Sequence, residues 1–175
     1  MIYRRLKFVL FDMIGTTIQD SKNGDSLVID SFEKAFSING IQVNFLEINQ
    51  QRGKNKKEAI YNILYSHNQT CNLADKIYSD FMDLMNNSLI RLSEIDGASN
   101  VFRVLREKGI KIGLGSGLPM DLIVSIIKII GWKLENFDYV GSSEELGKGR
   151  PDPIMINDSL SKLNIKDLSK VLKVG

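Results

Sequence analysis

Residues 8–17, FVLFDMIGTT, decide the fold of this chain. The four apolar residues that open this stretch are typical of a strand buried on both faces of a parallel sheet. The strand delivers the carboxylate of Asp12 into a turn, where Gly15 permits an unusual backbone angle and Thr16 and Thr17 offer hydroxyls. Such a turn predicts a concavity that binds an anion beside the carboxylate. In a purely structural interpretation, Asp12 only caps the turn through its side chain.

The composition is that of an ordinary globular protein, and it excludes several classes of function. With 175 residues the chain can build one sizeable core, or a core with a modest inserted domain. A net charge of +2 is too small to indicate nucleic acid or an anionic membrane as the main partner. Because Cys71 is the single cysteine and His67 the single histidine, a disulfide framework, a structural zinc site and a serine-histidine triad are excluded.

The sequence gives no indication of a membrane or secretory segment. No apolar run is long enough to span a bilayer. The basic start of the chain is followed by an apolar segment that Asp12 and Gly15 interrupt early, and no small-residue cleavage site follows. We therefore expect a cytoplasmic protein without a membrane partner, of an oligomeric state that the sequence leaves open.

The stretch 19–95 is predicted to be an all-helical block without a strand. Its apolar residues recur at helical spacing, and capping residues and glycines separate the helices. The predicted helices run from a cap at Asp25 or Ser26 to Gly40, over about 45–50, over about 56–66, and from a cap at Asn72 to about 95. This block separates the first strand, expected over 7–11, from the rest of the sheet.

After Gly97 the pattern changes to alternating helices and strands. Helices are predicted around 101–105 and over 121–130 and 153–163, and strands over 110–114, 139–140 and 170–174. The alternation predicts an α/β fold with a mostly parallel sheet. Ligands of such sheets bind at the carboxyl ends of the strands. We therefore expect the turn after Asp12, the Ser116-Gly117 pair and the loop around Arg150 to meet at that edge.

The Ser116-Gly117 pair and the loop around Arg150 can each bind an anion, and together with Asp12 they indicate a protein family. Ser116 and Gly117 offer a hydroxyl and a backbone N–H, although a Gly-Ser-Gly segment alone is more often a plain turn. Arg150, beside Pro151, can neutralise a phosphate and a carboxylate, or it is only an exposed loop charge. In this order and spacing the elements resemble the haloacid dehalogenase superfamily of phosphotransferases and hydrolases. The resemblance covers essentially the whole chain.

The resemblance implies a domain organisation and a set of functional residues. Residues 1–18 and 96–175 would form a Rossmann-like core, and 19–95 a helical cap domain. Asp12 would be the nucleophile that forms an aspartyl-phosphate, with Mg²⁺ offsetting the charge and held by Asp12 and the backbone carbonyl of Ile14. The phosphoryl group of a small phosphorylated or phosphonylated substrate would be bound by Thr16, Ser116, the N–H of Gly117, and Arg150.

Ile14 indicates a branch of the superfamily. Most phosphatases of the superfamily carry an aspartate at this position, which protonates the leaving alcohol and later activates water. The phosphonoacetaldehyde hydrolase branch has a small apolar residue there, in a D-x-A-G-T-T pattern, and residues 12–17 of this chain are similar to it. In that branch the leaving group is carbon, which is activated as an imine on a cap lysine.

The cap carries a partial match to the same branch. The branch has M-G-x-x-K-x-x-H where residues 52–59 of this chain are RGKNKKEA. Gly53 and Lys56 match, whereas Arg52 replaces the methionine and Ala59 replaces the histidine. Arg52 and Gly53 are therefore candidate substrate-binding residues. Lys56 has three interpretations: it grips a phosphate or carboxylate, it forms an imine, or it is a solvated surface lysine.

The last predicted strand leads to a hypothesis about the metal site. In the family this strand continues into a G-D-x-x-x-D type loop that completes the Mg²⁺ site, and the sequence stops at Gly175. One carboxylate and one carbonyl would bind Mg²⁺ weakly. The sequence is then either a fragment of a longer protein, which we favour, or a shortened relative with impaired chemistry, and we expect the last strand to be an exposed edge. The expected function is Mg²⁺-dependent hydrolysis of a small phosphonate or phosphate ester through Asp12, and the alternative is a non-catalytic phosphate-binding or regulatory relative.

Overall fold

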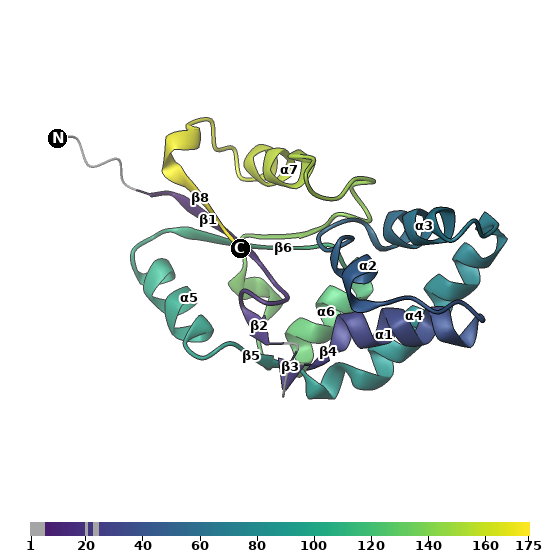
Figure 1. The fold of residues 1–175 in the computed structure, drawn as a ribbon. Helices are drawn as coiled ribbons and strands as arrows, with labels where there is room; N and C mark the ends of the chain where they lie inside the picture. Colours follow the sequence, from purple (N-terminus) through teal and green to yellow (C-terminus); the bar gives the residue numbers. More distant parts are fainter. Residues whose placement is uncertain (1–5, 20, 23–24) are drawn as a thin grey trace.

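A four-stranded parallel sheet forms the centre of the molecule in the computed structural model, which describes residues 6–19, 21–22 and 25–175 (Figure 1). The strand order is β7-β6-β1-β8, so β8 lies at an edge as expected. The strands are β1 (Phe8–Asp12), β6 (Lys111–Ser116), β7 (Tyr139–Ser142) and β8 (Val171–Val174). The predicted α/β fold with a parallel sheet is confirmed.

The apolar residues of β1 are buried on both faces of the sheet, which explains its continuous hydrophobic sequence. Phe8 and Leu10 pack on one face, and Val9 and Phe11 on the other. In the register between β1 and β6, Asp12 lies opposite Gly115, one residue before the end of β6. The polar groups that follow the two strands are therefore neighbours at one edge of the sheet.

Helices cover both faces of the sheet (Figure 1). One face packs against α5 (Ala98–Glu107) and α6 (Met120–Ile129), followed by the short 3-10 helix η3 (Leu134–Asn136). The other face is covered by α7 (Ile154–Lys162), and the 3-10 helix η4 (Leu168–Lys170) precedes β8. Of the helices in the described ranges, none has both the length and the hydrophobicity that crossing a membrane requires.

The inserted segment between β1 and α5 forms a group of helices beside the sheet (Figure 1). They are α1 (Leu27–Ile38), α2 (Phe45–Asn49), α3 (Lys56–Ser66) and α4 (Ala74–Ser88), with 3-10 turns η1 (Cys71–Leu73) and η2 (Leu89–Arg91). Ser26 caps α1, Asn44 caps α2 and Asn55 caps α3 through their side chains. Phe32 of α1 packs on Phe81 of α4, with ring centroids 4.6 Å apart.

The expectation of an all-helical block over 19–95 is wrong in detail, because the segment contains short strands. β3 (Ser21–Lys22) pairs antiparallel with β4 (Asp25–Ser26). β2 (Ile18–Gln19) pairs antiparallel with β5 (Ser93–Glu94), where the chain enters and leaves the insertion. Two-residue strands are too short to produce a recognisable alternation of polar and apolar residues, so the sequence could not reveal them.

The helix predicted from Asn72 to about 95 is shorter than expected. Asn72 lies inside η1 and does not cap α4, which begins at Ala74 without a side-chain cap and ends at Ser88. The proposed limits of the core and cap domains remain predictions. Residues 1–5 of the predicted core and residues 20 and 23–24 of the predicted cap lie outside the described residues.

Candidate active site

The turn after β1 is held by backbone hydrogen bonds that fix the position of Asp12. The carbonyl of Met13 accepts hydrogen bonds from the N–H groups of Thr16, Thr17 and Ile18, at 3.2, 2.9 and 2.9 Å. The hydroxyl of Thr17 donates to the carbonyl of Asp12 at 3.1 Å, and its side chain is buried. Thr17 is therefore part of the turn itself, and it holds the end of β1 beside the carboxylate.

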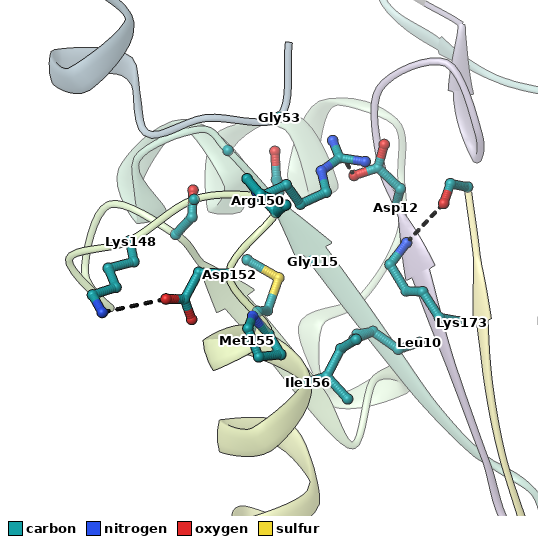
Figure 2. Close-up of a pocket in the computed structure, with 17 residues that line it drawn as sticks. Leu10, Asp12, Gly53, Gly115, Lys148, Arg150, Asp152, Met155, Ile156 and Lys173 are labelled. Carbon is teal, nitrogen blue, oxygen red and sulfur yellow. Dashed lines mark hydrogen bonds and ion pairs between the residues drawn. The ribbon is translucent and has the colours of Figure 1, made fainter. Parts of the chain in front are cut away.

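Arg150 extends over the carboxyl edge of the sheet and pairs with Asp12 (Figure 2). Its Nη2 lies 3.4 Å from Oδ1 of Asp12, whose side chain is 14% exposed. The backbone N–H of Arg150 donates to the carbonyl of Gly53 in the cap at 3.0 Å. Gly53 has φ +81°, and a methyl group there would lie 2.8 Å from Cζ of Arg150. Glycine is thus required where the cap loop crosses the guanidinium.

The end of β6 supplies two hydrogen-bond donors beside Asp12. Ser116 is buried, and its Oγ accepts a hydrogen bond from the N–H of Leu118 at 3.1 Å. Because that bond uses Ser116 only as an acceptor, the hydroxyl proton stays available to a ligand. Within the described ranges the N–H of Gly117 takes part in no hydrogen bond. A methyl group at Gly117 would lie 2.8 Å from the carbonyl oxygen of Lys54, so the cap loop also closes on this point.

Two adjoining cavities share these residues. The first, of about 370 Å³, lies toward α7 and is lined on that side by Leu10, Met155 and Ile156 (Figure 2). The second, of about 320 Å³, lies between the core and the cap. The residues common to both cavities are Asp12, Gly53, Ser116, Gly117 and Arg150.

The cavity between core and cap adds further predicted site residues. Arg52, Lys56 and Ile14 line it together with Val28 and Leu118. The structure therefore brings together all the candidate site residues named from the sequence except one. Thr16 instead lines a separate depression with Thr17 and Val174, among others, on another side of the turn.

A comparison with known protein families agrees with this arrangement. The family model for haloacid dehalogenase-like hydrolases matches residues 6–175. The chain belongs to the haloacid dehalogenase-like hydrolases. The membership predicted from the strand-end motifs is therefore confirmed.

Relatives of this chain support the branch suggested by Ile14. A phosphonoacetaldehyde hydrolase from Vibrio campbellii is 28% identical over 97% of this chain, which covers 67% of that relative. Among solved structures, a hydrolase from Pseudomonas syringae has a TM-score of 0.82 and 16% identity, over 98% of this chain and 76% of that one. A phosphonoacetaldehyde hydrolase-like protein from Oleispira antarctica has a TM-score of 0.81 and 22% identity, over 96% and 64%. These structural likenesses show a shared fold.

Lys56, the lysine of the cap motif, is buried. It is the first residue of α3, and only 7% of its surface is exposed. Its Nζ lies 5.6 Å from the ring centroid of Phe32. Burial lowers the pKa of this amine from 10.5 to about 8, helped by the charge of Arg150 and opposed by that of Asp12. The interpretation of Lys56 as a solvated surface residue is wrong, because the side chain is enclosed and lines the cavity.

Sequence reasoning missed a contact between cap and core beside this lysine. The hydroxyl of Tyr78, on α4, donates to Oε1 of Glu144 at 2.5 Å. Oε2 of Glu144 is buried and has no hydrogen-bond partner in the described part of the chain. The charge of Glu144 raises the pKa of Lys56, and burial together with the bond to Glu144 raises the pKa of Tyr78. The position of Glu144 just after β7 is the only sequence signal that could have drawn attention to it.

The described residues do not fit a complete resident Mg²⁺ site, although haloacid dehalogenase-like hydrolases generally depend on Mg²⁺. Among them, no three or more histidine, cysteine, aspartate or glutamate side chains form a group able to hold a metal. The carboxylate of Asp12 and the carbonyl of Ile14 would give Mg²⁺ two of the six oxygen ligands it prefers. The assignment of Asp12 and Ile14 as metal ligands stays a prediction.

Proposed function

We propose that this chain hydrolyses a small phosphonate or phosphate ester through an aspartyl-phosphate on Asp12. The observation that carries the proposal is the convergence of one carboxylate, three cations and two free donors on a single cavity at the carboxyl edge of the sheet. The carboxylate is Asp12, the cations are Arg52, Lys56 and Arg150, and the donors are Ser116 and Gly117. A nucleophile beside cations and backbone donors suits attack on an anionic phosphorus centre.

Each group has a role in this proposal. Arg150 neutralises phosphoryl oxygens and offsets the charge of Asp12, from which its Nη2 is 3.4 Å away. Ser116 and the N–H of Gly117 donate to the remaining oxygens. Asp12 attacks the phosphorus atom while the bond to the leaving group breaks. Water then cleaves the aspartyl-phosphate, so that inorganic phosphate leaves, the carboxylate is restored, and the leaving group gains a proton.

Lys56 has two candidate roles. As a cation it would grip an anionic substrate oxygen. As an amine with a pKa lowered to about 8, it would add to a substrate carbonyl and form an imine, which can accept the electron pair of a breaking carbon–phosphorus bond. Borohydride reduction in the presence of phosphonoacetaldehyde should attach the substrate to Lys56 if the imine forms. If turnover survives in Lys56→Arg and no adduct forms in the wild type, the remaining role of Lys56 is to bind an anionic substrate oxygen as a cation.

Replacing the nucleophile tests the reaction. The full chain, incubated with MgCl₂ and a panel of small phosphate esters and phosphonates, should release inorganic phosphate. Asp12→Asn should lower that rate by at least about a thousandfold, because the amide is not a nucleophile. Asp83→Asn, on an exposed part of α4, is the matched control and should retain the rate. Phosphate release that Asp12→Asn does not reduce would contradict the proposal.

A second candidate function is phosphate binding without turnover. It is favoured by Ile14, which provides no proton donor, and by the lack of an acidic metal-binding group in the described part of the chain. Calorimetry with inorganic phosphate distinguishes the two functions. Binding without phosphate release from any compound of the panel would support this second candidate, and turnover abolished by Asp12→Asn would reject it.

A further inference from the structure

Lys173, on β8, is a lysine that the proposed reaction does not use. In the register between β1 and β8 it lies opposite Leu10, two residues before Asp12. Its half-buried side chain lines the cavity toward α7, which Asp12 and Arg150 also line (Figure 2). Its Nζ donates a hydrogen bond to the carbonyl of Val174 at 2.7 Å. The amine is therefore held at the same edge of the sheet as the candidate nucleophile.

The charge of Lys173 is available to Asp12. Within the described ranges Lys173 forms no ion pair, whereas Nζ of Lys148, in the same cavity, lies 3.3 Å from the carboxylate of Asp152. Burial lowers the pKa of Lys173, the charge of Asp12 raises it, and the charge of Arg150 lowers it. Lys173 and Asp12 are therefore close enough for each charge to act on the other across the cavity.

Lys173 approaches Asp12 from the side opposite to the proposed phosphoryl-binding groups. The strand order is β7-β6-β1-β8, and Asp12 ends β1. Ser116 ends β6 and Arg150 follows β7, so both come from one side of β1, whereas β8 lies on the other side. Lys173 lines the cavity toward α7 and does not line the cavity between core and cap. Its charge therefore acts mainly on the carboxylate of Asp12 rather than on the phosphoryl oxygens.

The charge of Asp12 changes in opposite directions during the two steps of the proposed reaction. When Asp12 attacks the phosphorus atom, the carboxylate gives up its negative charge to the new oxygen–phosphorus bond. When water attacks the aspartyl-phosphate, that bond breaks and its electron pair returns to the carboxylate, while the oxygen and protons of the water go to the inorganic phosphate. A fixed cation beside the carboxylate favours the second step, because negative charge develops there.

We propose that Lys173 is a positioning residue for the hydrolysis step, and that its charge stabilises Asp12 as the leaving group when water cleaves the aspartyl-phosphate. This inference rests on the proposed function. Lys173 acts through Asp12 and touches no part of the substrate. Removal of its charge should slow the second step and not the first, so that the phosphorylated form of Asp12 accumulates.

Rapid-quench measurement of the phosphorylated protein tests the inference. The full chain is mixed with MgCl₂ and acetyl phosphate as the phosphoryl donor, quenched in acid, and the phosphoryl group on Asp12 is quantified by mass spectrometry. Lys173→Met should release phosphate about tenfold more slowly, with a larger phosphorylated fraction and a lower KM than the wild type. Lys173→Arg keeps the charge and should restore all three quantities. Lys148→Met removes a lysine of the same cavity whose charge is already paired with Asp152, and it should behave as the wild type.

The outcomes separate this inference from the proposed function. Slower release in Lys173→Met without accumulation of the phosphorylated form, or a phosphorylated fraction equal to that of the wild type, would overturn the role of Lys173 and leave the proposed hydrolysis standing. Failure of Lys173→Arg to restore release would also overturn it, because the defect would then lie in the fold and not in the charge. Phosphorylation of Asp12 in none of the proteins would overturn both proposals.

Discussion

Lys56 is a buried cation, and the burial of its charge lowers the stability of the folded state. Its pKa is lowered from 10.5 to about 8, first by burial and then by the charge of Arg150. Between about pH 8 and 10.5 the unfolded chain holds a proton that the folded chain has lost, so stability rises with pH in this window. Below pH 8 both states carry the proton, and the folded state bears the full cost of the buried charge.

Replacement of Lys56 should therefore stabilise the protein at neutral pH. Lys56→Met should raise the free energy of unfolding at pH 7 by on the order of 3 kcal/mol, which corresponds to the lowering of the pKa from 10.5 to about 8. The advantage should shrink as the pH rises from 8 to 10.5. Chemical denaturation at several pH values measures it, with Lys34→Met on the exposed side of α1 as the control. A difference that does not change with pH would contradict the lowered pKa.

At the scale of residues, the sequence predicts the positions of site residues best where a polar or charged side chain lies at or just after the end of a strand. Asp12, Ser116 and Arg150 could be predicted as neighbours because parallel strands place their carboxyl ends at one edge. The sequence predicts Thr17 as a hydroxyl of the anion-binding turn, whereas its hydroxyl bonds the carbonyl of Asp12. This use within the turn depends on backbone geometry that residue types do not encode. Tyr78 lies on α4 without any motif, so its contact with Glu144 could come only from the structure.

At the scale of elements, the hydrogen bond from Tyr78 to Glu144 joins the cap helix α4 to the loop after β7. Tyr78→Phe would leave a buried carboxylate with neither oxygen bonded, because Oε2 of Glu144 already lacks a partner among the described residues. The expected loss is about 1–3 kcal/mol of stability, with a higher KM because the cap is held less firmly. Denaturation and steady-state kinetics measure both effects.

A matched pair of variants isolates this contact. Tyr65→Phe removes a hydroxyl from a side chain that is 84% exposed, and it should change neither stability nor KM. In Glu144→Leu, which removes the acceptor, the further effect of Tyr78→Phe should be smaller, since the two residues act through one bond. Additive losses in the double variant would show that the bond does not couple cap and core.

The elements also differ in how well the sequence predicted them. The helices α1, α3 and α6 have apolar stripes and clear ends, and their predicted limits agree with the structure within a few residues. The strands β2 and β5 are two residues each and are defined only by pairing across the insertion. Pairing between segments distant in the chain leaves no local pattern, which is why the block was expected to be entirely helical.

At the scale of the whole molecule, the two faces of the sheet are stabilised unequally. The face under α5 and α6 belongs to one large apolar core that continues into the cap helices. The face under α7 has a separate cluster, and its buried members among the described residues are Phe8, Leu10, Tyr139 and Leu160. Local opening follows the amount of buried apolar contact, so α7 should open more readily than α6. The loop that carries Arg150 leads directly into α7, and its position depends on this weaker face.

Hydrogen exchange followed by mass spectrometry should reveal this asymmetry. Amides of α7 should exchange with a lower free energy of opening than those of α6. Leu160→Ala should accelerate exchange in α7 while α6 stays protected, because the cavity it leaves lies in the small cluster. Leu122→Ala, in the large core, should instead lower the protection of α5, α6 and the sheet together. If α7 and α6 exchange only through one common unfolding event, the sheet is held equally from both faces. Arg150 would then be as firmly fixed as Asp12.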